Sequence, residues 1–200
     1  MAIKKPIQDV FDQNKFDLLT AVKRSNSWFE KQVAAMAQQS ITPNKVLKGM
    51  PADLRATVTP GNLYMYVYDP KTKEDLPYYD RFPLVFPFRK TADGFYGLNM
   101  HYLPYDYRIK LLDQLLVFKS NSRWDETTKI KYSWALIDGV SRYAAAKPCV
   151  KQYLSGHVRS QFRQIYSEDW ATAMLLPVER FVGASKQQVW KDSKRTIRKA

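Results

Sequence analysis

Three pairs of adjacent carboxylates are the residues of this chain whose type and spacing could support acid–base chemistry. The pairs are Glu74 with Asp75, Asp125 with Glu126, and Glu168 with Asp169. Each pair falls at a predicted turn or helix start, where capping and the helix macrodipole favour acidic residues without any catalytic role. We therefore interpret all three pairs as structural.

The sequence offers equally little support for nucleophilic catalysis or for metal binding. The single cysteine, Cys149, excludes an internal disulfide and a cysteine-based zinc site, and no base neighbours it. The two histidines, His101 and His157, are not joined by closely spaced carboxylates, so we expect no metal site. We expect Cys149 to be a buried structural thiol and His101 to be a hydrogen-bonded packing residue. The sequence therefore predicts a protein that is not an enzyme and that binds no cofactor and no small-molecule substrate.

Basic side chains give the strongest functional signal. The 200 residues include 32 Lys and Arg against 19 Asp and Glu, which is a formal net charge of +13. Such an excess favours an anionic partner, because phosphates bind basic proteins through contacts that do not depend on base sequence. The cations gather where acidic residues are absent or rare, between Gly139 and Ser167 and again after Ser185. The predicted contacts to double-stranded DNA are Arg142, Lys147, Lys151, Arg159, Arg163, Lys191, Lys194, Arg195 and Arg198.

Helical spacing would group these cations. Residues four apart share one face of a helix, which predicts that Lys147 lies beside Lys151 and Arg159 beside Arg163. The cations after Ser185 would form a basic arm suited to phosphates. A solvated, fraying end is the alternative for this arm, and an acidic protein subunit is the alternative to DNA as the partner.

Aromatic residues interleave with lysines and arginines between residues 63 and 104. Rings beside cations can stack on single-stranded nucleic acid. Rings also fill the core of a small sheet and are enriched in protein interfaces, and we favour these two roles here. The predicted protein-interface residues are Tyr78, Tyr79, Phe82 and Tyr102.

The N-terminal half predicts helices followed by strands. Apolar residues recur at helical spacing over residues 7–39, without Pro or Gly, which predicts two helices. Prolines and glycines crowd residues 42–105, where residues 63–68 alternate aliphatic and tyrosine side chains as a strand does. Residues 82–89 and 95–102 are predicted to form a hairpin with its turn at residues 91–94. Pro83 and Pro87 should place the first of these strands at a sheet edge or interrupt it.

The helical period returns after Pro104. It predicts a helix over residues 109–118 and a second over residues 126–146 with Asp125 as its N-cap. Shorter helices are expected near residues 149–154, 157–166 and 168–175, and a last one begins at Ser185 with a capping box.

The predicted fold class is α+β, with N-terminal helices, a small antiparallel β-sheet or partial barrel, and a C-terminal helical half. Four segments are expected along the chain. They are an N-terminal helical segment (1–41), a small β domain (42–104), a helical region packed on it (105–183) and a basic C-terminal helix or arm (184–200).

Five stretches of the chain resemble a known group of proteins. They are residues 64–71 (YMYVYDPK), 76–85 (LPYYDRFPLV), 97–104 (GLNMHYLP), 134–140 (WALIDGV) and 176–181 (LPVERF). The sequence resembles virion proteins of T-even-type contractile-tailed phages of marine bacteria, some of which are similar to DNA end protectors. The resemblance covers most of the chain after about Trp28. Within these stretches, residues 78–80 and 99–102 either line a shared surface or lock turns through Asp and Asn side chains.

Charge and resemblance together predict a non-catalytic phage virion protein that binds DNA through its basic surface. The resemblance implies that it caps packaged DNA ends against host exonuclease, helps to finish the head, and is made in the cytoplasm of the bacterial host. The alternative is a tail, neck or baseplate assembly protein that binds neighbouring virion subunits. The expected partners are double-stranded DNA and other virion proteins, and no membrane, because no apolar stretch is long enough to cross a bilayer.

Overall fold

The computed structural model describes residues 53–119 and 121–199, so the two helices predicted over residues 7–39 lie outside the described residues. The strands are β1 (Leu54–Arg55), β2 (Leu63–Met65), β3 (Tyr79–Asp80), β4 (Leu84–Lys90), β5 (Gly94–Asn99), β6 (Val150–Leu154), β7 (Phe162–Ile165) and β8 (Phe181–Val182). The α-helices are α5 (Tyr105–Lys119), α6 (Glu126–Ser141), α7 (Trp170–Leu175) and α8 (Lys186–Arg198). Short 3-10 helices join them: η2 (Lys73–Asp75), η3 (Met100–Tyr102), η4 (Ala144–Ala146), η5 (Ser155–His157) and η6 (Ser167–Asp169).

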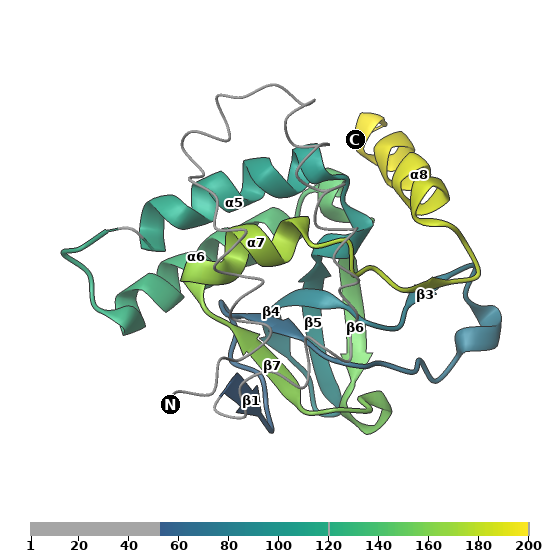
Figure 1. Cartoon of the computed structure of the whole chain (residues 1–200), viewed down its shortest axis with the longest axis horizontal. Helices are drawn as coiled ribbons and strands as arrows, with labels where there is room; N and C mark the ends of the chain where they lie inside the picture. The colour runs from purple at the N-terminus through teal and green to yellow at the C-terminus, as the bar shows by residue number, and fades with distance from the viewer. Residues whose placement is uncertain (1–52, 120, 200) are drawn as a thin grey trace, which may run out of the picture.

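An antiparallel sheet organises the described part of the chain. Its strand order is β1-β7-β2-β4-β5-β6, and β3 pairs with β8 in a separate two-stranded sheet. Helices α5, α6 and α7 pack over one side of the large sheet, and α8 lies to one side of them (Figure 1). The predicted α+β class is confirmed.

The alternation of residues 63–68 divides the apolar residues between the two faces of the sheet. Leu63 and Met65 belong to the larger core, which includes residues of α5, α6 and α7. Tyr64, Tyr66 and Tyr68 point to the opposite face and pack with other rings in a second, smaller cluster. This two-faced arrangement confirms the prediction from the period-two pattern, because successive side chains of a strand alternate between faces.

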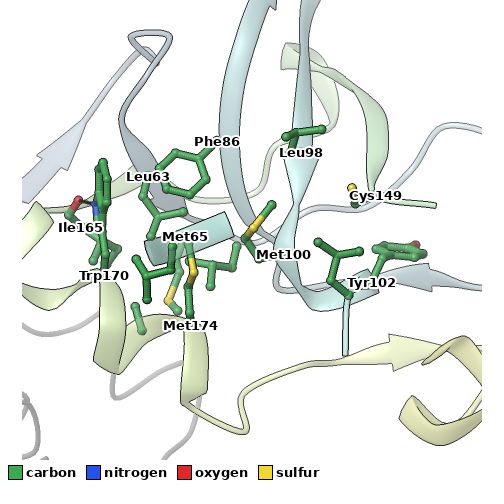
Figure 2. Close-up of a cluster of buried hydrophobic side chains, with 14 of the residues drawn as sticks. Leu63, Met65, Phe86, Leu98, Met100, Tyr102, Cys149, Ile165, Trp170 and Met174 are labelled. Carbon is green, nitrogen blue, oxygen red and sulfur yellow. Dashed lines mark hydrogen bonds between the residues drawn. The ribbon is translucent and has the colours of Figure 1, made fainter. Parts of the chain in front are cut away.

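The larger core is densest where α7 meets the sheet. Figure 2 shows Trp170 and Met174 of α7 beside Leu63 and Met65 of β2. The ring of Trp170 meets Phe86 of β4 edge to face at 4.9 Å between centroids, and its indole N–H donates to the carbonyl of Ile165 at 2.8 Å. The tryptophan is thus buried with its polar atom satisfied, which fixes α7 on the sheet.

The predicted hairpin is present as β4 and β5. Strand β4 contains Pro87 and begins just after Pro83; it lies between β2 and β5, so the prediction that these prolines mark a sheet edge is wrong. The other prediction, an interruption, is confirmed, because the register of the β4–β5 pair shifts between Pro87 and Arg89. Pro87 has no N–H to donate, and a bulge at this point lets an interior strand contain it.

The C-terminal half contains strands where the sequence predicts helices. Residues 150–154 form β6, which pairs with β5, and residues 162–165 form β7, which pairs with β1 and β2. The expected helices near residues 149–154 and 157–166 are therefore wrong, and the C-terminal half is only partly helical. Apolar segments this short carry no decisive period, so pairing with strands far away in the sequence decides their structure.

The longer helices agree with the prediction. Helix α6 begins after Asp125, whose carboxylate accepts the N–H of Thr128 at 2.6 Å, and α8 begins after Ser185, whose hydroxyl accepts the N–H of Gln188 at 3.2 Å. Helix α6 ends at Ser141, earlier than predicted, and α7 matches the helix expected near residues 168–175. Local capping chemistry was thus a sound guide to where these helices begin.

Replacing Gly94 with alanine should destabilise the fold by about 1–3 kcal/mol. Gly94 faces Leu154 across the β5–β6 pair, and a Cβ atom there would overlap the carbonyl oxygen of Tyr153. Urea denaturation measures the loss. Gly156→Ala is the matched control, because no described atom beyond its chain neighbours lies within 4 Å of its Cβ position, and it should change stability by less than about 0.5 kcal/mol.

Candidate nucleic-acid interface

Helix α8 presents a stripe of cations on its outer face. Val189 and Ser193 of this helix are buried, and Trp190 packs on the larger core. The stripe consists of Lys191, Lys194, Arg195 and Arg198, which are all exposed. With 3.6 residues per turn, these positions at spacings of three, four and seven fall on one side of the helix. We call these four residues the α8 stripe; it brings together four of the predicted DNA contacts.

The α8 stripe borders a shallow depression of about 610 Å³. Arg195 forms an ion pair with Asp192 at 3.4 Å while its side chain stays 71% exposed, so this pairing leaves the guanidinium accessible. Helix α8 also packs against η4, and Lys147, which directly follows η4, is exposed. The predicted contact Lys147 therefore lies near the same helix.

Two contacts with other elements fix α8 to the rest of the fold. The indole N–H of Trp190 donates to the carbonyl of His101 at 2.8 Å. The ammonium of Lys186 lies 3.6 Å from a carboxylate oxygen of Glu179 and 5.0 Å from the centre of the Trp190 ring. The α8 stripe is thus carried by an anchored helix, not by the fraying end that was the alternative.

Beneath α8, Arg108 of α5 is fully buried and hydrogen-bonded in four directions. Its guanidinium donates to the carbonyls of Leu103 at 2.6 Å, Met174 at 2.8 Å and His101 at 3.2 Å. It also donates to the carboxylate of Glu179 at 2.7 Å, and that side chain is only 2% exposed. Arg108 therefore joins η3, α7 and the segment before β8, which together support α8.

The carboxylate of Glu179 is held in its charged form. Burial raises its pKa, but the positive charges of Arg108, His101 and Lys186 outweigh burial and lower the pKa to about 2. The pair is therefore ionised at neutral pH. No short-range pattern signals it, since its partners are 71 residues apart.

The remaining predicted cations do not form a one-signed surface. Arg142 pairs with Asp138, Arg159 lies 4.0 Å from Asp69, and Arg163 lies 3.6 Å from Asp53. Asp69 and Asp53, from distant segments, thus meet two cations of this stretch, and Asp138, one turn earlier in α6, meets a third.

These cations are displayed differently from what helical spacing predicts. Lys147 follows η4 whereas Lys151 lies in β6, and Arg159 precedes β7 whereas Arg163 lies within it, so neither pair shares a helix face. Arg163 is only 3% exposed and cannot meet a phosphate without rearrangement. The DNA surface that the structure supports is therefore narrower than the predicted one.

The predicted interface tyrosines line a pocket next to the sheet. Tyr78, Tyr79 and Tyr102 border a cavity of about 370 Å³, together with Lys151 of β6. The rings of Tyr78 and Tyr102 lie 6.0 Å apart, and the Lys151 ammonium lies 4.2 Å from the centre of the Tyr102 ring. We call this cavity the tyrosine pocket. The fourth predicted residue, Phe82, is 1% exposed and belongs to the core, so we do not keep it as an interface residue.

The tyrosine pocket adjoins the α8 stripe. Burial raises the pKa of the Tyr78 hydroxyl, the charge of Asp192 raises it further, and the charge of Arg195 lowers it. Tyr78 therefore lies within electrostatic range of two residues of α8. A residue assigned from the sequence to protein contact and one assigned to DNA contact thus influence each other electrostatically.

Asp80, Asn99 and His101 lock the turns behind the pocket. Asp80 accepts the N–H of Phe82 at 3.0 Å and the side-chain amide of Asn99 at 3.1 Å, and it bonds to Nδ1 of His101 at 2.8 Å. Asn99 in turn accepts the N–H of His101 at 3.0 Å. His101 is thus the expected hydrogen-bonded packing residue, and the turn-locking role of the Asp and Asn side chains is confirmed.

The described residues offer binding surfaces more than reactive groups. Burial raises the pKa of the Cys149 thiol to about 12, so it stays protonated, as expected of a structural thiol. Within residues 53–119 and 121–199, no group of three His, Cys, Asp or Glu side chains could hold a metal ion. In the same part of the chain, no helix is long and apolar enough to span a bilayer.

One comparison with known proteins identifies a family. The family model described as phage T4 terminal DNA protecting protein matches residues 8–195. No curated protein and no solved structure matches the chain.

Proposed function

The chain belongs to the family of the phage T4 terminal DNA protecting protein, and we propose that it covers the ends of phage DNA by binding their phosphates through the α8 stripe. The family supports a role at DNA ends that involves no catalysis. The observation that carries the mechanism is the alignment of four exposed cations on one anchored helix.

The α8 stripe suits a phosphate backbone better than base edges. Lysine and arginine side chains on an exposed helix face neutralise phosphates and release counterions, which supplies affinity without reading sequence. A protein that protects ends of any sequence needs this kind of contact. Lys147 extends the positive surface beside the helix.

The proposal includes a place and partners in the particle. A phage protein that covers packaged DNA ends would act in the virion, at the stage of head completion, after synthesis in the cytoplasm of the bacterial host. Other virion proteins would contact it there. The family match favours this function over the tail, neck or baseplate alternative.

Exonuclease protection of linear duplex DNA tests the proposed function. The full-length protein should slow digestion of linear DNA by a double-strand exonuclease, and it should bind linear DNA more tightly than the same DNA as a closed circle. Affinity should fall by about 100-fold between about 50 and 200 mM salt if three to four phosphates are neutralised. Equal binding to circles and linear DNA, with no protection of the ends, would contradict the proposal.

A further inference from the structure

The tyrosine pocket has the size and lining of a ligand site. Its volume of about 370 Å³ lies within the range of about 300–1,000 Å³ in which proteins bind small organic groups. Tyrosine rings form much of its wall, and Lys71 lies at its border as an exposed cation. A ligand with a flat ring and a negative charge would match this lining.

Lys151 is the half-buried cation of the pocket, and it has no counterion among the described residues. Within the described part of the chain, no carboxylate lies within 4 Å of its ammonium and no hydrogen-bond acceptor reaches it. Its side chain is half-buried against the Tyr102 ring, and burial lowers its pKa. A desolvated cation that has only a ring beside it gains when an anion arrives.

The carboxylate that borders the pocket does not fill that role. Asp80 is 3% exposed and is bonded to Asn99, His101 and the N–H of Phe82. Its bonding capacity is thus directed into the turns behind the pocket. The anion that would complement Lys151 must therefore come from outside these residues.

We propose that the tyrosine pocket receives the terminal nucleotide of the DNA end, with its base against the tyrosine rings and its phosphate at Lys151. This inference rests on the proposed function. Base–tyrosine stacking tolerates any base, so the pocket would need no sequence preference. The adjoining α8 stripe then holds phosphates of the duplex behind the end.

The pocket gives a physical reason for preferring ends to internal sites. A terminal nucleotide is stacked on one side only and frays readily, whereas an internal nucleotide enters a pocket only after flipping out of the stack at a cost of a few kcal/mol. The α8 stripe by itself would bind a closed circle as well as an end. The pocket therefore supplies end selectivity and the stripe supplies general affinity.

Lys151→Met tests the inference, with Lys131→Met on the exposed face of α6 as the matched loss of one charge. The probe is a short blunt duplex that carries 2-aminopurine either at its last base pair or at its centre. Wild-type protein should change the fluorescence of the terminal probe and not that of the central one. Lys151→Met should weaken binding to the duplex by about tenfold or more and remove the terminal signal, while leaving binding to closed circular DNA unchanged.

If Lys151→Met binds DNA ends as tightly as wild-type protein and leaves the terminal signal unchanged, the inference is overturned, even if wild-type protein protects ends. Absence of end protection by wild-type protein in the same assay would instead overturn the proposed function and the inference with it. Thermal melting checks that Lys151→Met is folded. If it is not, Tyr79→Leu at the half-exposed rim and Lys151→Arg, which keeps the charge, take its place: the first should lose the terminal signal and the second should retain it.

Discussion

Arg108→Met is expected to lower the free energy of unfolding by about 3–5 kcal/mol, because it leaves the Glu179 carboxylate charged, buried and without its main partner. It also removes donors from three carbonyls that Arg108 satisfies. Urea denaturation followed by tryptophan fluorescence measures the loss.

The matched control for this variant is Arg142→Met. Arg142 also pairs with a carboxylate, that of Asp138, but its side chain is 76% exposed. Exposed pairs contribute about 0–1 kcal/mol, so this variant should be nearly neutral. Similar losses of unfolding free energy in both variants would show that burial is not the reason why the Arg108–Glu179 pair stabilises the fold.

The Arg108–Glu179 pair also predicts how stability depends on acid. The pKa of Glu179 is lowered from 4.5 to about 2 in the folded protein, so the folded state binds this proton less readily than the unfolded chain. The stabilisation is therefore fully present above about pH 4.5 and is lost as the pH falls toward 2, by an amount on the order of 3 kcal/mol. Unfolding free energies measured across this pH range should show a smaller loss in Glu179→Gln than in wild-type protein.

Neutralising the α8 stripe should cause the largest loss of DNA binding. The triple variant Lys191→Gln, Lys194→Gln, Arg198→Gln removes three exposed cations whose positions do not contribute to the core. Affinity for linear duplex should fall by about 100-fold or more near 50 mM salt, and the slope of log K against log salt should become shallower by about three. Fluorescence anisotropy over a salt series measures both quantities.

The control for the α8 stripe is a second triple variant with the same net charge. Lys110→Gln, Arg123→Gln and Lys131→Gln remove three exposed cations from α5, α6 and the loop between them. This variant should bind with nearly wild-type affinity, because close phosphate contacts and not distant net charge supply counterion release. An equal loss in both triples would mean that α8 is not the binding surface.

The adjacency of the tyrosine pocket and the α8 stripe changes how function is divided over the molecule. The sequence suggests that the helical C-terminal part contacts the polyanion and that the tyrosines contact protein. In the fold, Tyr78 lies within electrostatic range of Asp192 and Arg195, and Lys151 lies against Tyr102. A predicted DNA contact, Lys151, and three predicted interface tyrosines thus line one pocket.

Local pattern was sufficient for the features that depend on neighbours in the chain. The N-caps Asp125 and Ser185 bond within three residues, and the cations of α8 share a face because helix geometry alone puts them there. The alternation of residues 63–68 divided their side chains between two apolar clusters for the same reason. Each of these features depends on residues that are close together in the chain.

The features that only the tertiary structure decided are those that depend on partners distant in sequence. Strands β6 and β7 exist because β5, β1 and β2 offer their backbones, and Arg163 is buried beside Asp53 although its own stretch of sequence contains no acid. The Arg108–Glu179 pair and the contact between the Lys151 ammonium and the Tyr102 ring arise in the same way. The sequence by itself determined the basic character of this protein and the helix that displays it. Folding decided which of its cations remain available to bind an anion. Only folding brings a cation next to a carboxylate or keeps the two apart.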